Sequence, residues 1–301
     1  MSTILCPACL SHSSKVFVQR PMDREYFSRR DTDASFMRCT NCESLFQDPW
    51  PAADELQEFY GPDYQNYTTT AVPLLAHVDA VYQRQQGAAF TKRFGRDPAV
   101  LDFGCGQGGF LRVLAEAGCT QLAGFDFVLY EELVDTSGTK FFDDIEQIRE
   151  SGMRFDVIRM RHVIEHLTDV DATMIALGRL LKEGGCIVGQ TPNAAHYTSR
   201  LMGQYWGPLH YPYHTVLFSP SGLSVAAPRW GLRLTATTGP ILPTGWALSL
   251  ENMMKSAFKL KSRGRTAAYT VLMGLTMPMA LLDSWVTPKA TANFDFVLQR
   301  D

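Results

Sequence analysis

The fold is indicated most directly by one stretch of the chain, Leu101-Asp102-Phe103-Gly104-Cys105-Gly106-Gln107-Gly108-Gly109. An apolar strand over residues 99–103 leads into it, and a helical pattern over residues 110–117 follows it and stops at Gly118. Glycines let the backbone turn sharply and let a ligand approach without meeting a Cβ atom. The stretch therefore predicts a strand, a ligand-binding glycine turn and a helix.

Apolar strands continue to alternate with helices after this stretch. A helix is expected to end within residues 177–182, before Gly184-Gly185. This alternation predicts an α/β fold with a mostly parallel, doubly wound sheet, and 301 residues can hold one such domain plus a small appendage. We expect the later strands at residues 122–125, 140–142, 155–160 and 186–189, with a closing pair at residues 231–234 and 294–298.

The glycine turn fits two kinds of ligand by spacing alone. Its glycines match the G-x-G-x-x-G dinucleotide fingerprint, and Asp102 with Gly104, Gly106 and Gly108 matches the acidic-x-G-x-G-x-G pattern of methyltransferases. A dinucleotide would bring an anionic pyrophosphate, which Asp102 repels. S-adenosylmethionine would bring a sulfonium and an ammonium group, which a carboxylate favours. Asp126, after the second strand, suits the ribose hydroxyls of either ligand.

Residues 99 to about 220 resemble the class I S-adenosylmethionine-dependent methyltransferases, which have a Rossmann-like sheet. Residues 100–111 resemble motif I of that family, and residues 155–167 resemble its fourth strand and the Glu-His loop that follows. Asp143-Asp144 resembles the acidic patch that meets the adenine. The resemblance implies that the cofactor is bound by Asp102, Gly104, Gly106, Gly108, Asp126, Asp143 and Asp144.

The segment His162-Val163-Ile164-Glu165-His166 spells the H-x-x-E-H pattern of some zinc peptidases. Here it leaves an apolar strand directly, so it begins as a loop at the carboxyl edge of the sheet, where ligands bind in such folds. A neutral imidazole accepts a proton from a hydroxyl or amine near pH 7. We therefore expect His166 as the catalytic base, His162 as the second candidate and Glu165 beside them. The alternative is that Glu165 and His166 only cap the next helix.

The same Glu-His pair resembles that of quinone-pathway O-methyltransferases, in which this loop is associated with a divalent metal. This chain has His162 where an acidic residue is expected, which argues against a catalytic metal. A further segment, residues 205–218, resembles a substrate-side part of the family. We expect Tyr64, Tyr67, His210 and His214 on the substrate side of the site.

Two Cys-x-x-Cys pairs, Cys6/Cys9 and Cys39/Cys42, stand near the N-terminus. Four thiolates satisfy tetrahedral zinc, so we predict a structural zinc in a small zinc-ribbon-like unit over residues 1–48. The alternative is four reduced cysteines in a small core. Residues 49–97 would form a helical linker and lid, and residues 98–301 the methyltransferase domain, with a core separate from that of the zinc unit.

The composition of the chain limits the cellular compartment in which we expect the protein and the partners that it binds. The chain has seven cysteines and no N-terminal signal-peptide pattern, which predicts a reducing, cytoplasmic compartment. A formal net charge of -3 argues against nucleic acid as a partner, because no excess of basic residues is present to neutralise phosphates.

The C-terminal part of the chain has a pattern that could place it in contact with a membrane. Lys255, Lys259, Lys261, Arg263 and Arg265 precede an apolar run over residues 267–282 that Pro278 interrupts. The run is too short to span a bilayer. One interpretation is a peripheral membrane contact through residues 255–282. The other is a helix pair that packs on the sheet.

Together these patterns predict an enzyme that transfers a methyl group from S-adenosylmethionine to a small-molecule or sugar-type acceptor, which is soluble or lipid-linked. The methylated atom, whether O, N or C, stays open. Two alternatives remain: a nicotinamide-dependent Rossmann oxidoreductase, and a non-catalytic zinc-knuckle protein with a retained nucleotide pocket.

Overall fold

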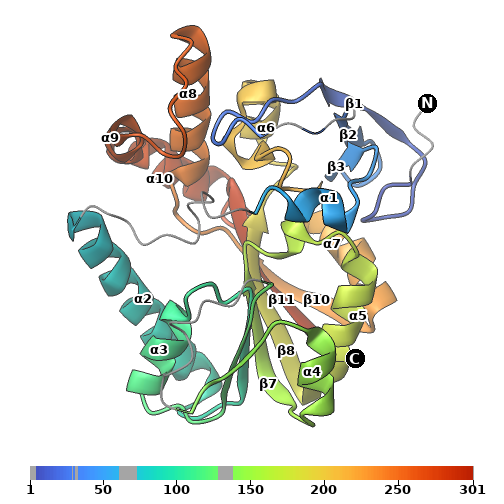
Figure 1. The fold of residues 1–301 in the computed structure, drawn as a ribbon, viewed down its shortest axis with the longest axis vertical. Helices are drawn as coiled ribbons and strands as arrows, with labels where there is room; N and C mark the ends of the chain where they lie inside the picture. The colour runs from blue at the N-terminus through green and yellow to red at the C-terminus, as the bar shows by residue number, and fades with distance from the viewer. Residues whose placement is uncertain (1–4, 29, 31–32, 61–72, 128–137, 301) are drawn as a thin grey trace.

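The computed structural model describes residues 5–28, 30, 33–60, 73–127 and 138–300. A seven-stranded sheet forms the lower half of the molecule in Figure 1, and a four-stranded sheet lies above it. The larger sheet has the order β10-β11-β8-β7-β4-β5-β6. Its strands are β4 (Val100–Phe103), β5 (Leu122–Phe125), β6 (Lys140–Phe142), β7 (Phe155–Arg161), β8 (Leu181–Pro192), β10 (Leu232–Thr238) and β11 (Asn293–Arg300).

The larger sheet is doubly wound, as the sequence predicts. β4 pairs in parallel with β5 on one side and with β7 on the other, and β7 pairs in parallel with β8. β11 runs antiparallel between β8 and β10, which confirms the predicted closing pair. The strand order therefore reverses at β4. In such sheets the crevice at the carboxyl ends of the strands beside this reversal is where ligands bind.

Helices cover both faces of this sheet. In Figure 1, α2 and α3 lie on one face, and α4 and α5 lie on the other. β4 shows why both faces are covered, since Leu101 packs in the core with α5 while Val100 packs in the core with α3. A strand buried on both faces is apolar throughout. The helices are α2 (Pro73–Phe94), α3 (Gly109–Glu116), α4 (Ile145–Glu150) and α5 (Val170–Leu180).

One predicted boundary is wrong. The helix expected to end within residues 177–182 ends at Leu180, and Leu181 already belongs to β8. The reason is tertiary pairing, because Leu181 already lies opposite Phe155 of β7. The register then shifts, and Cys186 is the next residue of β8 that pairs, with Val157. The glycines at 184 and 185 therefore interrupt a strand and do not end a helix.

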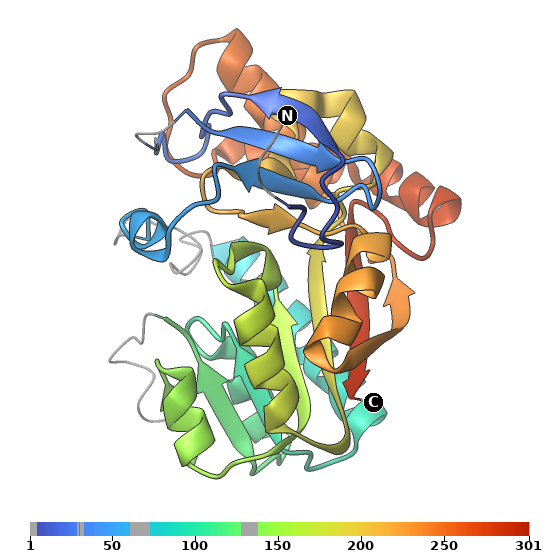
Figure 2. The same cartoon turned by 90° about the vertical axis from the view of Figure 1, so that its right-hand side faces the viewer.

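The N-terminal strands are joined to the rest of the chain. β1 (Ser14–Gln19), β2 (Ser35–Cys39) and β3 (Leu45–Asp48) form an antiparallel sheet whose fourth strand is β9 (Val216–Leu217). Figure 2 shows this sheet stacked above the larger one. The expectation of two separate cores is wrong, because Cys6, Phe46 and Phe218 belong to the same buried cluster as Leu101 and Phe103.

Short helices complete the upper half of the molecule. α1 (Ala53–Gln57) follows the N-terminal sheet, and α6 (Tyr197–Met202) and α7 (Pro220–Ala226) flank β9 in sequence. Three further helices, α8 (Thr244–Ala257), α9 (Ala267–Leu275) and α10 (Met277–Val286), precede the last strand. Throughout the described ranges, none of the helices has the length and apolar character needed to cross a bilayer.

Candidate active site and cysteine cluster

The glycine turn after β4 has the backbone geometry that its sequence requires. Gly104, Gly106 and Gly108 all have positive φ angles, of 82°, 51° and 69°. A Cβ atom at Gly104 would lie 2.3 Å from Cγ2 of Val163, so a side chain has no room there. Gly108 caps the N-terminus of α3. The turn therefore leaves backbone groups open to a ligand at the reversal point of the sheet.

Asp126 and Asp102 have different surroundings in the structure. Asp126 follows β5, and its Oδ2 accepts a hydrogen bond from the backbone N–H of Gly106 at 2.8 Å. Asp102 is fully buried and accepts a hydrogen bond from Nη1 of Arg159 at 2.7 Å. The Arg159 guanidinium also stacks on the Phe110 ring. Asp126 thus lines the cavity described below, whereas Asp102 lies beneath the turn.

Asp143 and Asp144 lie at the start of α4, just after β6. The side chain of Asp144 accepts from the backbone N–H of Glu146 and caps the helix. Asp143 accepts from the side-chain amide of Gln147 at 3.0 Å. Both contacts are local to α4, and the adenine-side role of the two residues stays a prediction.

A cavity of about 660 Å³ opens beside the glycine turn. Gly104, Gly106 and Asp126 line it at the carboxyl ends of β4 and β5. The opposite wall comes from segments far away in the chain. The predicted residues His162, His166, His210 and His214 line it together with Glu25, Leu56, Tyr60, Leu248 and Tyr269, which sequence reasoning did not single out, and with Arg265, which the sequence placed in the basic cluster.

Tyr60 is the most informative of the residues that were missed. Its hydroxyl lies 2.7 Å from Nδ1 of His166, and the two rings meet edge to face. The sequence feature that could have pointed to Tyr60 is its position directly before a tyrosine-rich segment. The predicted substrate-side residues Tyr64 and Tyr67 lie in that segment, outside the described residues.

Three histidines that line the cavity beside Tyr60, namely His166, His210 and His214, are held in their neutral form. Burial and the neighbouring His214 and His210 hold the pKa of His166 well below its usual value of 6.5. Burial likewise lowers the pKa values of His210 and His214 to about 3. The rings of His166 and His214 lie 4.6 Å apart. A neutral imidazole can accept a proton, which fits the role predicted for His166.

His162 and Glu165 form a separate hydrogen-bonded group. His162 Nδ1 lies 3.1 Å from Oε1 of Glu165, and its Nε2 lies 3.0 Å from Oε1 of Gln190. Both ring nitrogens thus lie against oxygens of the protein, so neither is directed toward a substrate. Burial raises the pKa of Glu165, but the hydrogen bond and charge of His162, the charge of His214 and a backbone hydrogen bond together lower it overall.

A metal-like grouping also occurs here. Ligand atoms of Glu165, His166 and His214 lie within 4.8 Å of one another. Glu165 is fully buried, and its two oxygens already accept from His162 and from Thr191 Oγ1. His214 Nδ1 donates to the carbonyl of Pro208. Hydrogen bonds therefore account for the positions of Glu165 and His214.

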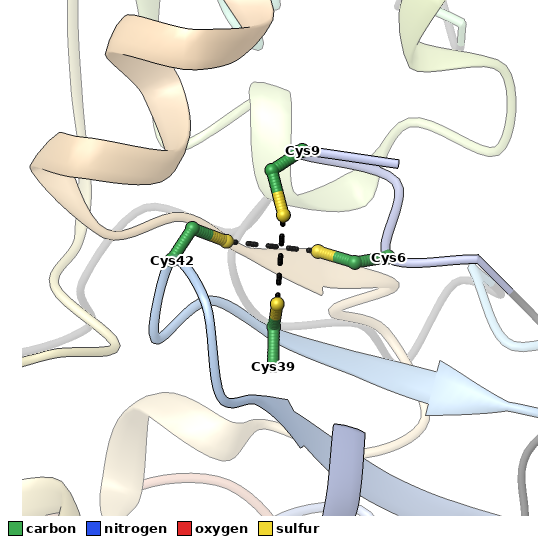
Figure 3. Close-up of side chains that lie close together, drawn as sticks. All are labelled: Cys6, Cys9, Cys39 and Cys42. Carbon is green, nitrogen blue, oxygen red and sulfur yellow. Dashed lines mark hydrogen bonds between the residues drawn. The ribbon is translucent and has the colours of Figure 1, made fainter. Parts of the chain in front are cut away.

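The four N-terminal cysteines converge on one point. Figure 3 shows Cys6 and Cys9 on one turn and Cys39 and Cys42 on another, with all four sulfurs directed toward a common centre. The Sγ atoms of Cys6 and Cys42 are 3.6 Å apart, and those of Cys9 and Cys39 are 3.5 Å apart. Tetrahedral zinc with bonds of about 2.3 Å needs sulfurs about 3.8 Å apart. All four thiols are free of disulfides.

Residues at the start of α7 and in the segment after it hold this cluster against the rest of the chain. The hydroxyls of Ser219 and Ser221 donate to the carbonyl of Cys42. Arg229 donates to the carbonyls of Pro7 and Ala8. The Cys6 thiol, hydrogen-bonded to the Cys42 sulfur, lowers the pKa of Cys42 to about 5 and favours the thiolate that a metal binds.

Comparison with known proteins identifies the class. A family model described as a methyltransferase domain matches residues 75–237, more than half of the chain. This chain belongs to that methyltransferase family. It is a class I S-adenosylmethionine-dependent methyltransferase, so the nicotinamide-dependent oxidoreductase and the non-catalytic binding protein are excluded as interpretations.

Individual relatives are distant. The ubiquinone biosynthesis O-methyltransferase of Brucella anthropi is 28% identical over 169 residues, which cover 49% of this chain and 68% of that protein. The protein of the same name from Mesorhizobium japonicum is 31% identical over 129 residues, which cover 37% of this chain and 50% of that protein. Among solved structures, a putative sarcosine dimethylglycine methyltransferase from Galdieria sulphuraria is 14% identical, with a TM-score of 0.48, over 82% of this chain and 99% of that one.

Proposed function

We propose that this enzyme methylates a hydroxyl group of a small-molecule acceptor, with His166 as the base that removes the hydroxyl proton. The observation that carries the proposal is the shared cavity. Gly104, Gly106 and Asp126 line one side of it, and His166 with Tyr60 lines the other. A methyl donor bound on the first side would face an acceptor bound on the second.

The first side supplies the groups for the cofactor. The carboxylate of Asp126 would accept hydrogen bonds from the ribose hydroxyls while it holds the backbone of Gly106. The positive φ angles of the turn leave its backbone close to the ligand. Asp102 acts through Arg159 and the turn, since it does not line the cavity.

The second side supplies the proton acceptor. The acceptor oxygen attacks the methyl carbon, and the carbon–sulfur bond of the sulfonium breaks. The hydroxyl proton passes to the Tyr60 hydroxyl, which gives its own proton to Nδ1 of the neutral His166 imidazole. The enzyme's contribution is to hold the two reactants in line and to receive this proton. Tyr60 fixes the imidazole through Nδ1. Glu165 holds His162 and makes the wall behind His166 rigid.

Two observations favour a hydroxyl on an apolar or lipid-linked acceptor over one on a free sugar. The named relatives are O-methyltransferases of ubiquinone biosynthesis, although their identity to this chain is low. Apolar and aromatic side chains of Leu56, Phe127, Val163, Leu248 and Tyr269 line much of the cavity. Pockets of this kind bind ligands mainly through apolar contact, with a few polar groups that orient them.

The test is a methyl-transfer assay with labelled S-adenosylmethionine and a panel of hydroxyl, amine and carbon acceptors, each in polar and lipid-linked form. We expect labelled product from hydroxyl acceptors in wild-type protein and its loss in His166→Ala. Transfer to amine or carbon acceptors alone would show that O-methylation is wrong. A chain that does not bind the cofactor in calorimetry would contradict the whole site.

We also propose a structural zinc at Cys6, Cys9, Cys39 and Cys42. Their sulfur spacing and their convergence support it. Bound zinc would hold the two turns together and brace β2 and β3 against β9 and α7. The cluster is mostly buried, and neither cysteine pair lies in a turn from a strand into a helix, which favours a structural role.

A further inference from the structure

We propose that helices α8–α10 form a docking face for an anionic lipid bilayer, and that a lipid-soluble acceptor enters the cavity from that bilayer. The docking face comprises residues 253–289. The proposal that this face binds a bilayer depends only on the exposed side chains of these helices. The entry route rests on the proposed function, because it assumes that the cavity receives an acceptor.

The docking face has an unusual surface of apolar side chains. Among the described residues, more than half of the exposed large apolar side chains fall within residues 253–286. α9 has no buried residue, and Figure 1 shows α8 and α9 projecting from the upper half of the molecule. Trp285 is 88% exposed. The apolar side chains of the docking face that are more than half exposed are Phe258, Val271, Leu275, Leu282, Trp285 and Val286.

The same face shows no negative charge. Asp283 is the one acidic residue between positions 252 and 289, and it is buried. Its two oxygens accept from the Trp246 indole at 2.8 Å and from the Tyr197 hydroxyl at 2.5 Å. Glu251, at the border, is buried and accepts from Thr266. The acidic groups of this region therefore hold the helices in place and leave its surface basic and apolar.

Positive charges adjoin the apolar side chains. Lys259, Lys261, Arg263 and Lys289 are exposed. Lys255, which the sequence placed in the basic cluster, is buried and donates to the carbonyl of Gly264 at 2.7 Å, so it adds nothing to the surface. Exposed basic residues beside tryptophan and aliphatic side chains are the pattern of helices that lie in the headgroup region of anionic membranes. This charge complementarity favours a bilayer over a second copy of the chain.

The docking face borders the cavity. Tyr269 of α9 and Arg265, both within the docking face, line it, and so does the start of α8 with Thr244, Gly245 and Leu248. Helices α8 and α9 also pack against each other. A bilayer held by their outer side chains would lie next to the wall that faces His166. An acceptor with an apolar tail could then present its hydroxyl to the site without leaving the lipid.

The test is flotation of the full-length protein with two kinds of vesicle, one of equal parts phosphatidylglycerol and phosphatidylcholine and one of phosphatidylcholine alone. We expect flotation with the anionic vesicles at low salt and release at high salt, because the Debye length falls from about 30 Å at 0.01 M to about 3 Å at 1 M. Lys259→Glu/Lys261→Glu/Lys289→Glu should bind about 100-fold more weakly.

Two further variants separate the docking face from general charge. Leu282→Ser/Trp285→Ser removes apolar side chains and should reduce flotation even at low salt. Lys92→Glu/Arg93→Glu/Arg112→Glu makes the same charge change on α2 and α3 and should float like wild type. All variants should bind S-adenosylmethionine in solution with unchanged affinity, which shows that they are folded.

Wild type that fails to float with anionic vesicles would overturn the proposal. So would a dimer in sedimentation that Leu282→Ser/Trp285→Ser converts to a monomer, because the face would then be an interface between copies. Failure of the proposed function is distinct from both, since it would show as absent cofactor binding or absent methyl transfer in protein that still floats.

Discussion

The Tyr60 hydroxyl lies 2.7 Å from Nδ1 of His166, although 106 positions separate the two residues in the chain. His166 follows β7 at the carboxyl edge of the sheet, whereas Tyr60 comes just after α1. The contact joins the segment before the methyltransferase sheet to the predicted base. It makes the orientation of the imidazole depend on a residue outside the family's motifs.

The first prediction concerns this pair. His166→Ala should lower turnover by about 10²–10⁴-fold, the usual contribution of a general base. Tyr60→Phe removes one hydrogen bond and should lower turnover by roughly 10-fold. Steady-state kinetics with a hydroxyl acceptor measures both. Cofactor affinity should stay unchanged in the two variants. Normal turnover in His166→Ala would move the role of base to His214 or His210.

The second prediction concerns Asp126. Asp126→Ala should weaken S-adenosylmethionine binding by roughly 10-fold or more, because charge-assisted hydrogen bonds contribute about 1.5–3 kcal/mol each. Isothermal titration calorimetry measures the affinity. Asp33→Ala, at an exposed carboxylate in the N-terminal part, is the matched control. Equal affinity in Asp126→Ala and in the control would remove Asp126 from the cofactor site.

The third prediction concerns pH. His166, His210 and His214 have folded-state pKa values below the unfolded value of about 6.5, so the unfolded state binds more protons at mildly acid pH. Their contribution to stability is complete above pH 6.5 and is lost as the pH falls below it, by at most about 1.4 kcal/mol per pH unit for each histidine.

Thermal unfolding between pH 7 and pH 5 tests this, because most carboxylates stay ionised there. We expect the melting temperature to fall with pH, and the slope to become smaller in His214→Gln. Gln86→Leu, at an exposed residue of α2 that does not titrate, should leave the slope as it is. A wild-type melting temperature that does not change between these pH values would contradict neutral burial of the three rings.

The fourth prediction concerns zinc. Purified protein should contain one zinc ion per chain, and Cys39→Ser/Cys42→Ser should lose it. Because the cysteines share a core with β4 and α5, loss of zinc should lower the melting temperature of the whole chain and not only of the N-terminal unit. Metal analysis and calorimetry measure the two effects. Cys119→Ser, elsewhere in the chain, is the control. Zinc-free wild type with full stability would leave four reduced cysteines in a core.

The fifth prediction concerns Gln47 of β3. This buried amide donates to the carbonyls of Pro212 and His214, each at 2.7 Å, and accepts from Arg30. Gln47→Leu removes the donor to the two carbonyls, which costs about 1–3 kcal/mol for each buried group left unpaired. We expect a lower free energy of unfolding and lower turnover, since the segment that carries His210 and His214 loses its support. Gln86→Leu on the exposed side of α2 should change neither.

Local patterns in the sequence were sufficient to predict the sheet and the glycine turn. A strand buried on both faces must be apolar, a tight turn against a ligand must be glycine, and both requirements act within a few residues, so β4, its turn and α3 could be read directly. The two Cys-x-x-Cys pairs could be read for the same reason, since each pair lies within one turn. The position of Asp126 beside the glycine turn could be predicted because it directly follows β5.

Tertiary structure decided which of these residues share a space. His162 and His166 are equivalent candidates in sequence, yet the first has both nitrogens against oxygens of the protein and the second faces the cavity beside Tyr60. Lys255 is one of five basic residues in a short run, yet it alone is buried. Burial and partners come from segments that are distant in the chain, and no local pattern encodes them. The sequence by itself determined which candidate binding and catalytic residues the chain contains. Packing between distant segments decided which of those residues lie together around one cavity.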